Sequence, residues 1–405
     1  MKNATPGNLF SEMAKREPRK AGILPSQEIM ELIRNGKIRS SVEISPEQVQ
    51  PASIDLRLGN VAYQVRASFL PDGKSPIGPK IRELLLKEID LSDPVVLGKD
   101  EVFIVPLVES LALPSDMGGK ANPKSTTGRL DIFTRLMTEC GAEFEAVPLG
   151  YSGTLYVEIV PRTFSIIVKA GTKLNQLRFY RGSPQSDDEQ LRKLAQKRQL
   201  VYYENDDAPS KPVIRGGLRV SVDLQGAKNT VVAYRAKPHD TPIDLARVGG
   251  YEVADFWEPI RAQDTKGLVL SPGEFYLLAS KERVGVPAGY AAEMESYDPS
   301  MGEFTVHYAG FFDPGFGHGT DGEIKGTKAV LEVRAHEVPI LLEDGREVAR
   351  LTYHKMADVP DKIYGQAIGS SYQQQGLALS KQFRATPKAQ AAGVVHFPST
   401  PLSKS

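Results

Sequence analysis

Short runs in which apolar residues alternate with polar ones recur along most of the chain. Such runs, rich in Val, Ile, Leu, Phe and Tyr and separated by Gly, Pro and Asp, predict β-strands. A second series begins near residue 213 and continues to about residue 384. The fold class predicted from this pattern is mainly β, as a sandwich, barrel or jelly roll. In the first half the runs cover 52–64, 95–108, 157–168 and 174–180.

The sequence predicts helices in two places. Near the start, apolar residues at 29, 32 and 33 predict one short helix, with Ser26 as its cap and Gly36 as its stop. The second place is 183–212, where a charged helical segment ends at an Asn-Asp-Asp-Ala-Pro sequence. We interpret 183–212 as a linker between a domain at 1–182 and a domain at 213–384. Residues 385–405, rich in Ala, Pro, Ser and Lys, are expected to form a loose tail.

The second half repeats motifs of the first. Ser-Ile-Asp-Leu at 53–56 returns as Ser-Val-Asp-Leu at 221–224. Glu158 lies 174 positions before Glu332, and further pairs keep this offset. Several ordered pairs at one offset indicate two copies of one β-rich domain.

Composition limits the partners and the compartment. Fifty Lys and Arg balance fifty Asp and Glu, so no global positive field favours a polynucleotide partner. A single cysteine, Cys140, cannot form an internal disulfide, and the first residues are polar rather than signal-like. Apolar stretches are too short to span a membrane. We therefore expect a cytoplasmic protein that binds neither membranes nor polynucleotides.

The segment 123–129, Pro-Lys-Ser-Thr-Thr-Gly-Arg, concentrates groups that bind phosphate. It places two cations, three hydroxyl groups and a flexible glycine within seven residues. An exposed polar turn is the alternative interpretation, and the segment lacks the spacing of a P-loop.

Two glutamates interrupt apolar strand runs. Glu158 lies within Leu-Tyr-Val-Glu-Ile-Val, and Glu332 lies within Ala-Val-Leu-Glu-Val. A buried carboxylate needs a partner or a task, whereas an outward, solvated strand face would need neither. Recurrence at matched positions favours a functional role.

Two further segments are candidates for ligand contacts. The Asp-Pro-Gly sequence at Asp313 predicts a turn. The Gly- and Gln-rich region from Tyr364 to Gly376 has the composition of a flap that closes over a ligand, and equally that of a disordered polar segment. Zinc deaminase chemistry is disfavoured, because the six histidines form no His-x-Glu motif and one cysteine cannot supply Pro-Cys-x-x-Cys.

In this order the motifs resemble the bacterial dCTP deaminases of the dCTP deaminase/dUTPase superfamily. Residues 23–38 and 50–59 are similar to the family's first helix and strand, and 124–130 to its phosphate-binding segment. Residues 330–333 resemble the strand that bears the catalytic glutamate, which the Asp-Pro-Gly turn precedes. Residues 372–376 resemble the closing tail.

The resemblance implies two tandem dUTPase-like β-clip domains, each a distorted jelly roll, in a homo-oligomer. It implies zinc-independent hydrolysis of dCTP to dUTP and ammonia, with Glu332 as general base, Glu158 as the alternative, and Mg²⁺ bound only through the triphosphate. The implied substrate-binding residues are Lys124, Ser125, Thr126, Thr127, Gly128, Arg129, Asp313, Tyr364, Tyr372 and Gln374.

Each copy departs from the family pattern in a complementary way. The first has Pro-Leu-Gly at 148–150 in place of Asp-Pro-Gly, and the second has Pro299 and Glu303 in place of the phosphate-binding Ser and Arg. We therefore expect a hybrid site that combines Ser125 and Arg129 with Asp313 and Glu332.

Two rival functions remain at the level of sequence. A dUTP pyrophosphatase, or an enzyme that both deaminates and cleaves at the α-phosphate, would use Asp313 to direct water to phosphorus. A non-catalytic nucleotide-binding regulator would have lost Glu332 or Arg129, and both are present.

Overall fold

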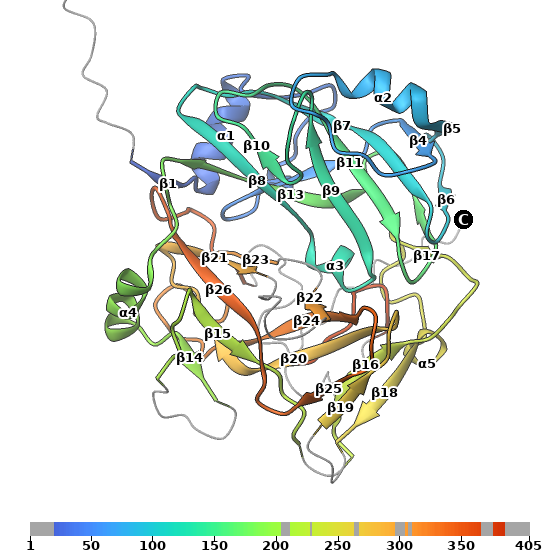
Figure 1. Cartoon of the computed structure of the whole chain (residues 1–405). Helices are drawn as coiled ribbons and strands as arrows, with labels where there is room; N and C mark the ends of the chain where they lie inside the picture. Colours follow the sequence, from blue (N-terminus) through green and yellow to red (C-terminus); the bar gives the residue numbers. More distant parts are fainter. Residues whose placement is uncertain are drawn as a thin grey trace, which may run out of the picture.

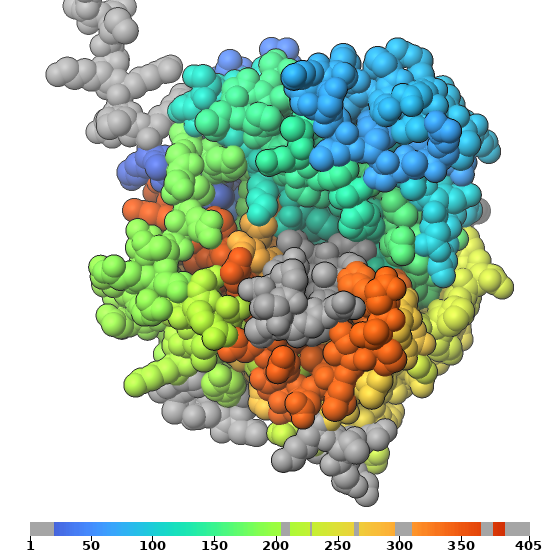
Figure 2. Space-filling view, viewed as in Figure 1, coloured from blue at the N-terminus to red at the C-terminus, as the bar shows by residue number. Residues whose placement is uncertain are grey.

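The computed structural model describes residues 20–203, 211–226, 229–262, 267–295, 304–306, 310–365 and 376–384. The chain is mainly β, and its two halves stack directly on each other (Figure 1). Figure 2 shows the blue and green first half packed onto the yellow and orange second half. One face of each sheet packs inward, which explains why apolar and polar residues alternate along the strands.

Two antiparallel sheets form the first half. One follows the order β1-β13-β8-β10 with β3 on β13, and the other β5-β4-β7-β11-β9 with β2 on β7. The strands of the first sheet are β1 (Gly22–Ile23), β3 (Ile54–Arg57), β8 (Met117–Pro123), β10 (Ala146–Val147) and β13 (Lys173–Arg181). Those of the second are β2 (Ile38–Ser40), β4 (Val61–Val65), β5 (Leu85–Asp90), β7 (Val102–Ala112), β9 (Ile132–Thr138) and β11 (Ser152–Pro161).

The second half repeats this arrangement. Its sheets follow the orders β18-β16-β20-β24-β22, with β14 on β20, and β15-β26-β21-β23. The strands of the first are β14 (Val201–Tyr202), β16 (Val231–Ala236), β18 (Trp257–Arg261), β20 (Phe275–Val284), β22 (Phe304–Val306) and β24 (Thr327–Ala335). Those of the second are β15 (Leu218–Ser221), β21 (Tyr290–Glu295), β23 (Phe311–Phe312) and β26 (Glu347–Lys355), and β19 (Gly267–Leu270) pairs separately with β25 (Ile340–Glu343).

Helices are short and lie at the edges of the sheets. The N-terminal helix α1 begins one residue earlier than a Ser26 cap would place it, because Pro25 is the capping residue and Ser26 is already helical. Gly36 follows the helix at φ 62°, a conformation that suits a glycine stop. The helices are α1 (Ser26–Arg34), α2 (Ile77–Leu84), α3 (Ser125–Gly128), α4 (Asp188–Lys197) and α5 (Val253–Phe256), with a 3₁₀ turn η1 (Pro46–Gln48).

The two halves share part of their hydrophobic core. Trp257 of the second half is buried, with its ring 5.8 Å from Phe164 of the first half and 5.9 Å from Phe383. β6 (Val95–Leu97) and β12 (Ile166–Val168) form a sheet with β17 (Ile243–Asp244), which pairs parallel to β12 across the junction. In the segment expected as a linker, Leu191 and Leu194 of α4 belong to the core of the second half.

Candidate active site at the junction of the two halves

The predicted phosphate segment forms α3 and the turns on either side of it. Thr127 is buried and its hydroxyl donates a hydrogen bond to the Leu174 carbonyl at 2.8 Å, so the turn is fixed to the sheet. Ser125 is half-buried, whereas Arg129 is 3% exposed. The segment therefore lies at the junction with a buried cation at its end (Figure 1).

The chain near its C-terminus crosses this segment. Arg129 Nη1 donates to the Ala378 carbonyl at 3.1 Å, and the Ser380 hydroxyl donates to the Thr126 carbonyl at 3.1 Å. Tyr372 and Gln374 lie outside the described residues. The contacts with the phosphate segment are made by Ala378 and Ser380, which follow the predicted flap.

Glu332 lies on β24, opposite Leu277 of β20, with β22 on the other side. Its side chain is buried, and burial raises the pKa of this carboxyl to about 7. The positive charge of Arg129, from the other half of the chain, lowers the pKa, while Asp131 raises it. The fold thus brings Arg129 into electrostatic range of Glu332.

Asp313 follows β23 and begins the predicted turn, in which Gly315 adopts φ 94°. Its Oδ1 accepts a hydrogen bond from Arg178 Nη2 at 3.0 Å, and Arg178 also donates to the carbonyls of Phe312 and Ala292 at 2.9 and 2.8 Å. Burial raises the pKa of Asp313, and Arg178 acts in the opposite direction. Arg178 comes from β13, so a residue of the first half holds the turn of the second.

Sequence reasoning missed Arg178. The signal was present, because this arginine interrupts the strand run Leu-Asn-Gln-Leu-Arg-Phe-Tyr much as Glu158 and Glu332 interrupt theirs. Its partner could not be identified from the local pattern, since Asp313 lies in the other half.

Two more predicted residues lie beside this turn. The Tyr364 amide donates to the Pro314 carbonyl at 2.9 Å, and its ring centroid is 5.5 Å from that of Phe316. Lys124 forms an ion pair with Asp55, and both residues influence the pKa of Asp313. Predicted residues of both halves therefore surround Asp313.

Glu158 has a different environment. It is fully buried on β11, and its Oε1 accepts from Arg135 Nε and Nη2 at 2.9 and 2.6 Å. Arg135 lies directly opposite on β9 and also donates to the Ser68 hydroxyl at 2.7 Å. The alternative of a solvated strand face is wrong for both Glu158 and Glu332, because both are buried.

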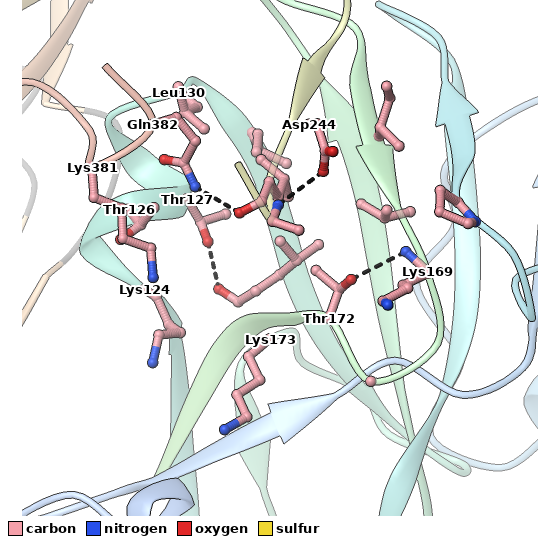
Figure 3. A pocket seen from close by; sticks show the side chains of 18 of the residues that line it. Lys124, Thr126, Thr127, Leu130, Lys169, Thr172, Lys173, Asp244, Lys381 and Gln382 are labelled. Carbon is pink, nitrogen blue, oxygen red and sulfur yellow. Dashed lines mark hydrogen bonds between the residues drawn. The ribbon is translucent and has the colours of Figure 1, made fainter. Parts of the chain in front are cut away.

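A cavity of about 670 Å³, lined by both apolar and polar residues, lies beside α3. Figure 3 shows Thr126 and Thr127 on its wall, with the Lys124 and Lys173 side chains at the same end. Burial and the neighbouring Lys124 and Lys173 lower the pKa of Lys381, which also lines the cavity. The phosphate segment thus borders a region of positive charge.

Two features are absent from the described residues. Within them, no three His, Cys, Asp or Glu side chains are grouped so that they could hold a metal ion. Among the helices of the same residues, none is both long and apolar enough to cross a membrane.

The repeated β-clip halves and the buried carboxylates at their junction define a protein of the dCTP deaminase/dUTPase superfamily, as the sequence predicted. Family models described as the N-terminal and C-terminal domains of 2'-deoxycytidine 5'-triphosphate deaminase match residues 20–183 and 187–383. A crystal structure of 2'-deoxycytidine 5'-triphosphate deaminase from Agrobacterium tumefaciens is 48% identical, with a TM-score of 0.79, and covers 85% of this chain and 100% of that one. The chain belongs to the 2'-deoxycytidine 5'-triphosphate deaminase family.

Shorter relatives match about a third to a half of the chain. A protein from Dictyoglomus thermophilum named "dCTP deaminase, dUMP-forming" is 26% identical over 194 residues, which are 46% of this chain and 92% of that relative. One of the same name from Corynebacterium glutamicum is 32% identical over 128 residues, 31% of this chain and 64% of that relative.

Proposed function

We propose that this protein hydrolyses dCTP to dUTP and ammonia at one hybrid site per chain. The observation that carries the proposal is that Arg129, from the first half, lies within electrostatic range of the buried Glu332, from the second. A buried carboxylate with a pKa near 7 suits a general base, because a fraction is ionised at neutral pH and still accepts protons readily. A buried arginine beside it suits an anionic substrate.

In the proposed reaction Glu332 takes a proton from water as the water oxygen bonds to C4 of cytosine. The C4–N3 double bond opens, and Glu332 passes this proton to N3. Glu332 then takes the proton of the new C4 hydroxyl group and gives it to the amino group, so C4 becomes a carbonyl, the C4–N4 bond breaks, and ammonia leaves with uracil in place of cytosine. Water supplies the oxygen and the protons, so atoms and charge balance.

The triphosphate is proposed to be bound by Lys124, Ser125, Thr126 and Arg129. Mg²⁺ bound to the phosphate oxygens of the nucleotide would neutralise part of the triphosphate charge. This role needs no metal ligand from the protein. Asp313, held by Arg178, and Tyr364 are proposed to bound the nucleoside. Tyr372 and Gln374 keep their proposed role in closing the site. The homo-oligomer and the cytoplasmic location also remain proposals.

The names of the shorter relatives favour a second candidate, a deaminase that also releases dUMP. In that reaction Asp313 would direct water to the α-phosphate. Arg178 already neutralises this carboxylate at 3.0 Å, which supports deamination alone.

One assay distinguishes these activities. The full chain is incubated with dCTP, dUTP, CTP or dCMP plus Mg²⁺, and the products are separated by ion-exchange chromatography. We expect dUTP and ammonia from dCTP, and no change when a zinc-selective chelator is added. Formation of dUMP and pyrophosphate would identify the second candidate, and binding without turnover would leave the regulator.

A further inference from the structure

A second pair of charges crosses the junction immediately beside Arg129 and Glu332. Asp131 Oδ2 accepts a hydrogen bond from Arg334 Nη2, and the Thr163 hydroxyl donates to the same Oδ2 at 2.5 Å. Asp131 is 1% exposed, and the side chain of Arg334 is 12% exposed. Such a shielded pair is sensitive to the loss of either partner.

Charges of opposite sign alternate in each half, two positions apart. Asp131 follows Arg129 by two positions in the first half, and Arg334 follows Glu332 by two positions on β24. Residues two apart on a strand point to the same face, so Glu332 and Arg334 both face the first half. Each half therefore contributes one positive and one negative charge.

Asp131 adopts a backbone conformation that aspartate rarely takes. Its φ is 54°, in the left-handed region that favours glycine. The turn is held by hydrogen bonds from the Asp131 amide to the Gly128 carbonyl and from the Arg162 amide to the Asp131 carbonyl, both 2.9 Å. Strain of this kind persists only where the surroundings impose it, and here the carboxylate is directed to Arg334.

We propose that Asp131 and Arg334 are positioning residues that fix Arg129 of the first half against Glu332 of the second. The pair anchors the turn that carries Arg129 to the strand that carries Glu332. It also places one negative and one positive charge near Glu332, so the loss of either partner changes the net charge there. The proposal rests on the function proposed for Glu332.

The test compares Asp131→Asn, Arg334→Met and the double variant. Among the described residues, Arg129 and Asp131 act on the pKa of Glu332, and Arg334, two positions after Glu332 on the same strand, is paired with Asp131. Asp131→Asn removes a negative charge near Glu332, so the acid limb of the kcat profile should move to lower pH, by about one unit. Arg334→Met removes a positive charge, so the limb should move to higher pH by a similar amount. The double variant should return it towards the wild-type position.

Two controls separate this role from folding. Arg334→Lys keeps the charge, so its acid limb should stay in place even if the melting temperature falls. Arg235→Met removes an arginine that donates to Glu258 at 2.9 Å in the same sheet, and its profile should match the wild type. Unmoved limbs, or shifts in one direction for both single variants, would overturn the proposal. If Glu332→Gln retains turnover, the proposed function fails instead, whatever the pair variants do.

Discussion

Glu158 and Glu332 occupy matched strands of the two halves, yet their surroundings differ in one decisive respect. Glu158 is neutralised by Arg135, one strand away in the same sheet, at 2.6 Å. The cation that acts on Glu332 is Arg129, which comes from the other half. The source of the positive charge, and not the glutamate itself, therefore distinguishes Glu158 from Glu332, the proposed base.

Helix α2 packs on the sheet face that carries Glu158. Ile77 and Ile81 of α2 are buried against Met137, together with the partly buried Tyr156, which shares a strand face with Glu158. The Arg135 guanidinium also stacks on the Phe144 ring, 3.6 Å from its centroid. The first copy has thus filled the space beside its glutamate with its own side chains.

The largest effect is expected from the substitution that removes the proposed base. Glu332→Gln keeps the size and hydrogen-bonding capacity of the side chain, so turnover should fall at least about a hundredfold while dCTP still binds. Steady-state ammonia release and calorimetric binding measure the two properties. Turnover within a few fold of wild type would refute the role of Glu332.

Removal of the cross-half cation should have the next largest effect. Arg129→Ala should reduce kcat/KM by roughly 30- to 1,000-fold, or about 2–4 kcal/mol, if two charge-assisted bonds to phosphate are lost. Glu303, the matched position in the second copy, lies outside the described residues, and Glu303→Ala should change little. Equal damage from both substitutions would contradict the division of labour between the halves.

The pH dependence of kcat also distinguishes the two glutamates. A base must be ionised, and the pKa of Glu332 is raised to about 7, so kcat should rise with pH through this value and then level off. At pH 6 about one tenth of the plateau should remain. Glu158→Gln should not move this limb, and a wild-type profile that is flat from pH 5 to 8 would argue against Glu332.

The fold could be predicted because strand alternation and the internal repeat are local signals. The hybrid site, which rests on the complementary departures in the two copies, stays a prediction. Helix α2 was missed although Ile77, Ile81 and Leu84 have helical spacing, because eight residues containing Pro79 give a weak signal. The pairs Arg178–Asp313 and Asp131–Arg334 join positions far apart in the chain, so only the packing of the halves reveals them.

The smallest effect on turnover, and the clearest on stability, is expected at Glu158. Glu158→Gln should leave kcat within about threefold of wild type, because the Glu158 carboxylate is already bound by Arg135 and covered by α2. The free energy of unfolding should fall by about 1–3 kcal/mol, since a buried charge-assisted pair becomes a neutral contact beside a partly shielded guanidinium. Denaturant unfolding and ammonia release on the same preparation measure both.

Because Arg135→Met removes the other partner, it should cause a similar or larger loss of stability, again with little effect on turnover. If Glu158→Gln and Glu332→Gln each lost half of the activity, two independent sites would operate in each chain, and the contrast between the two glutamates would disappear.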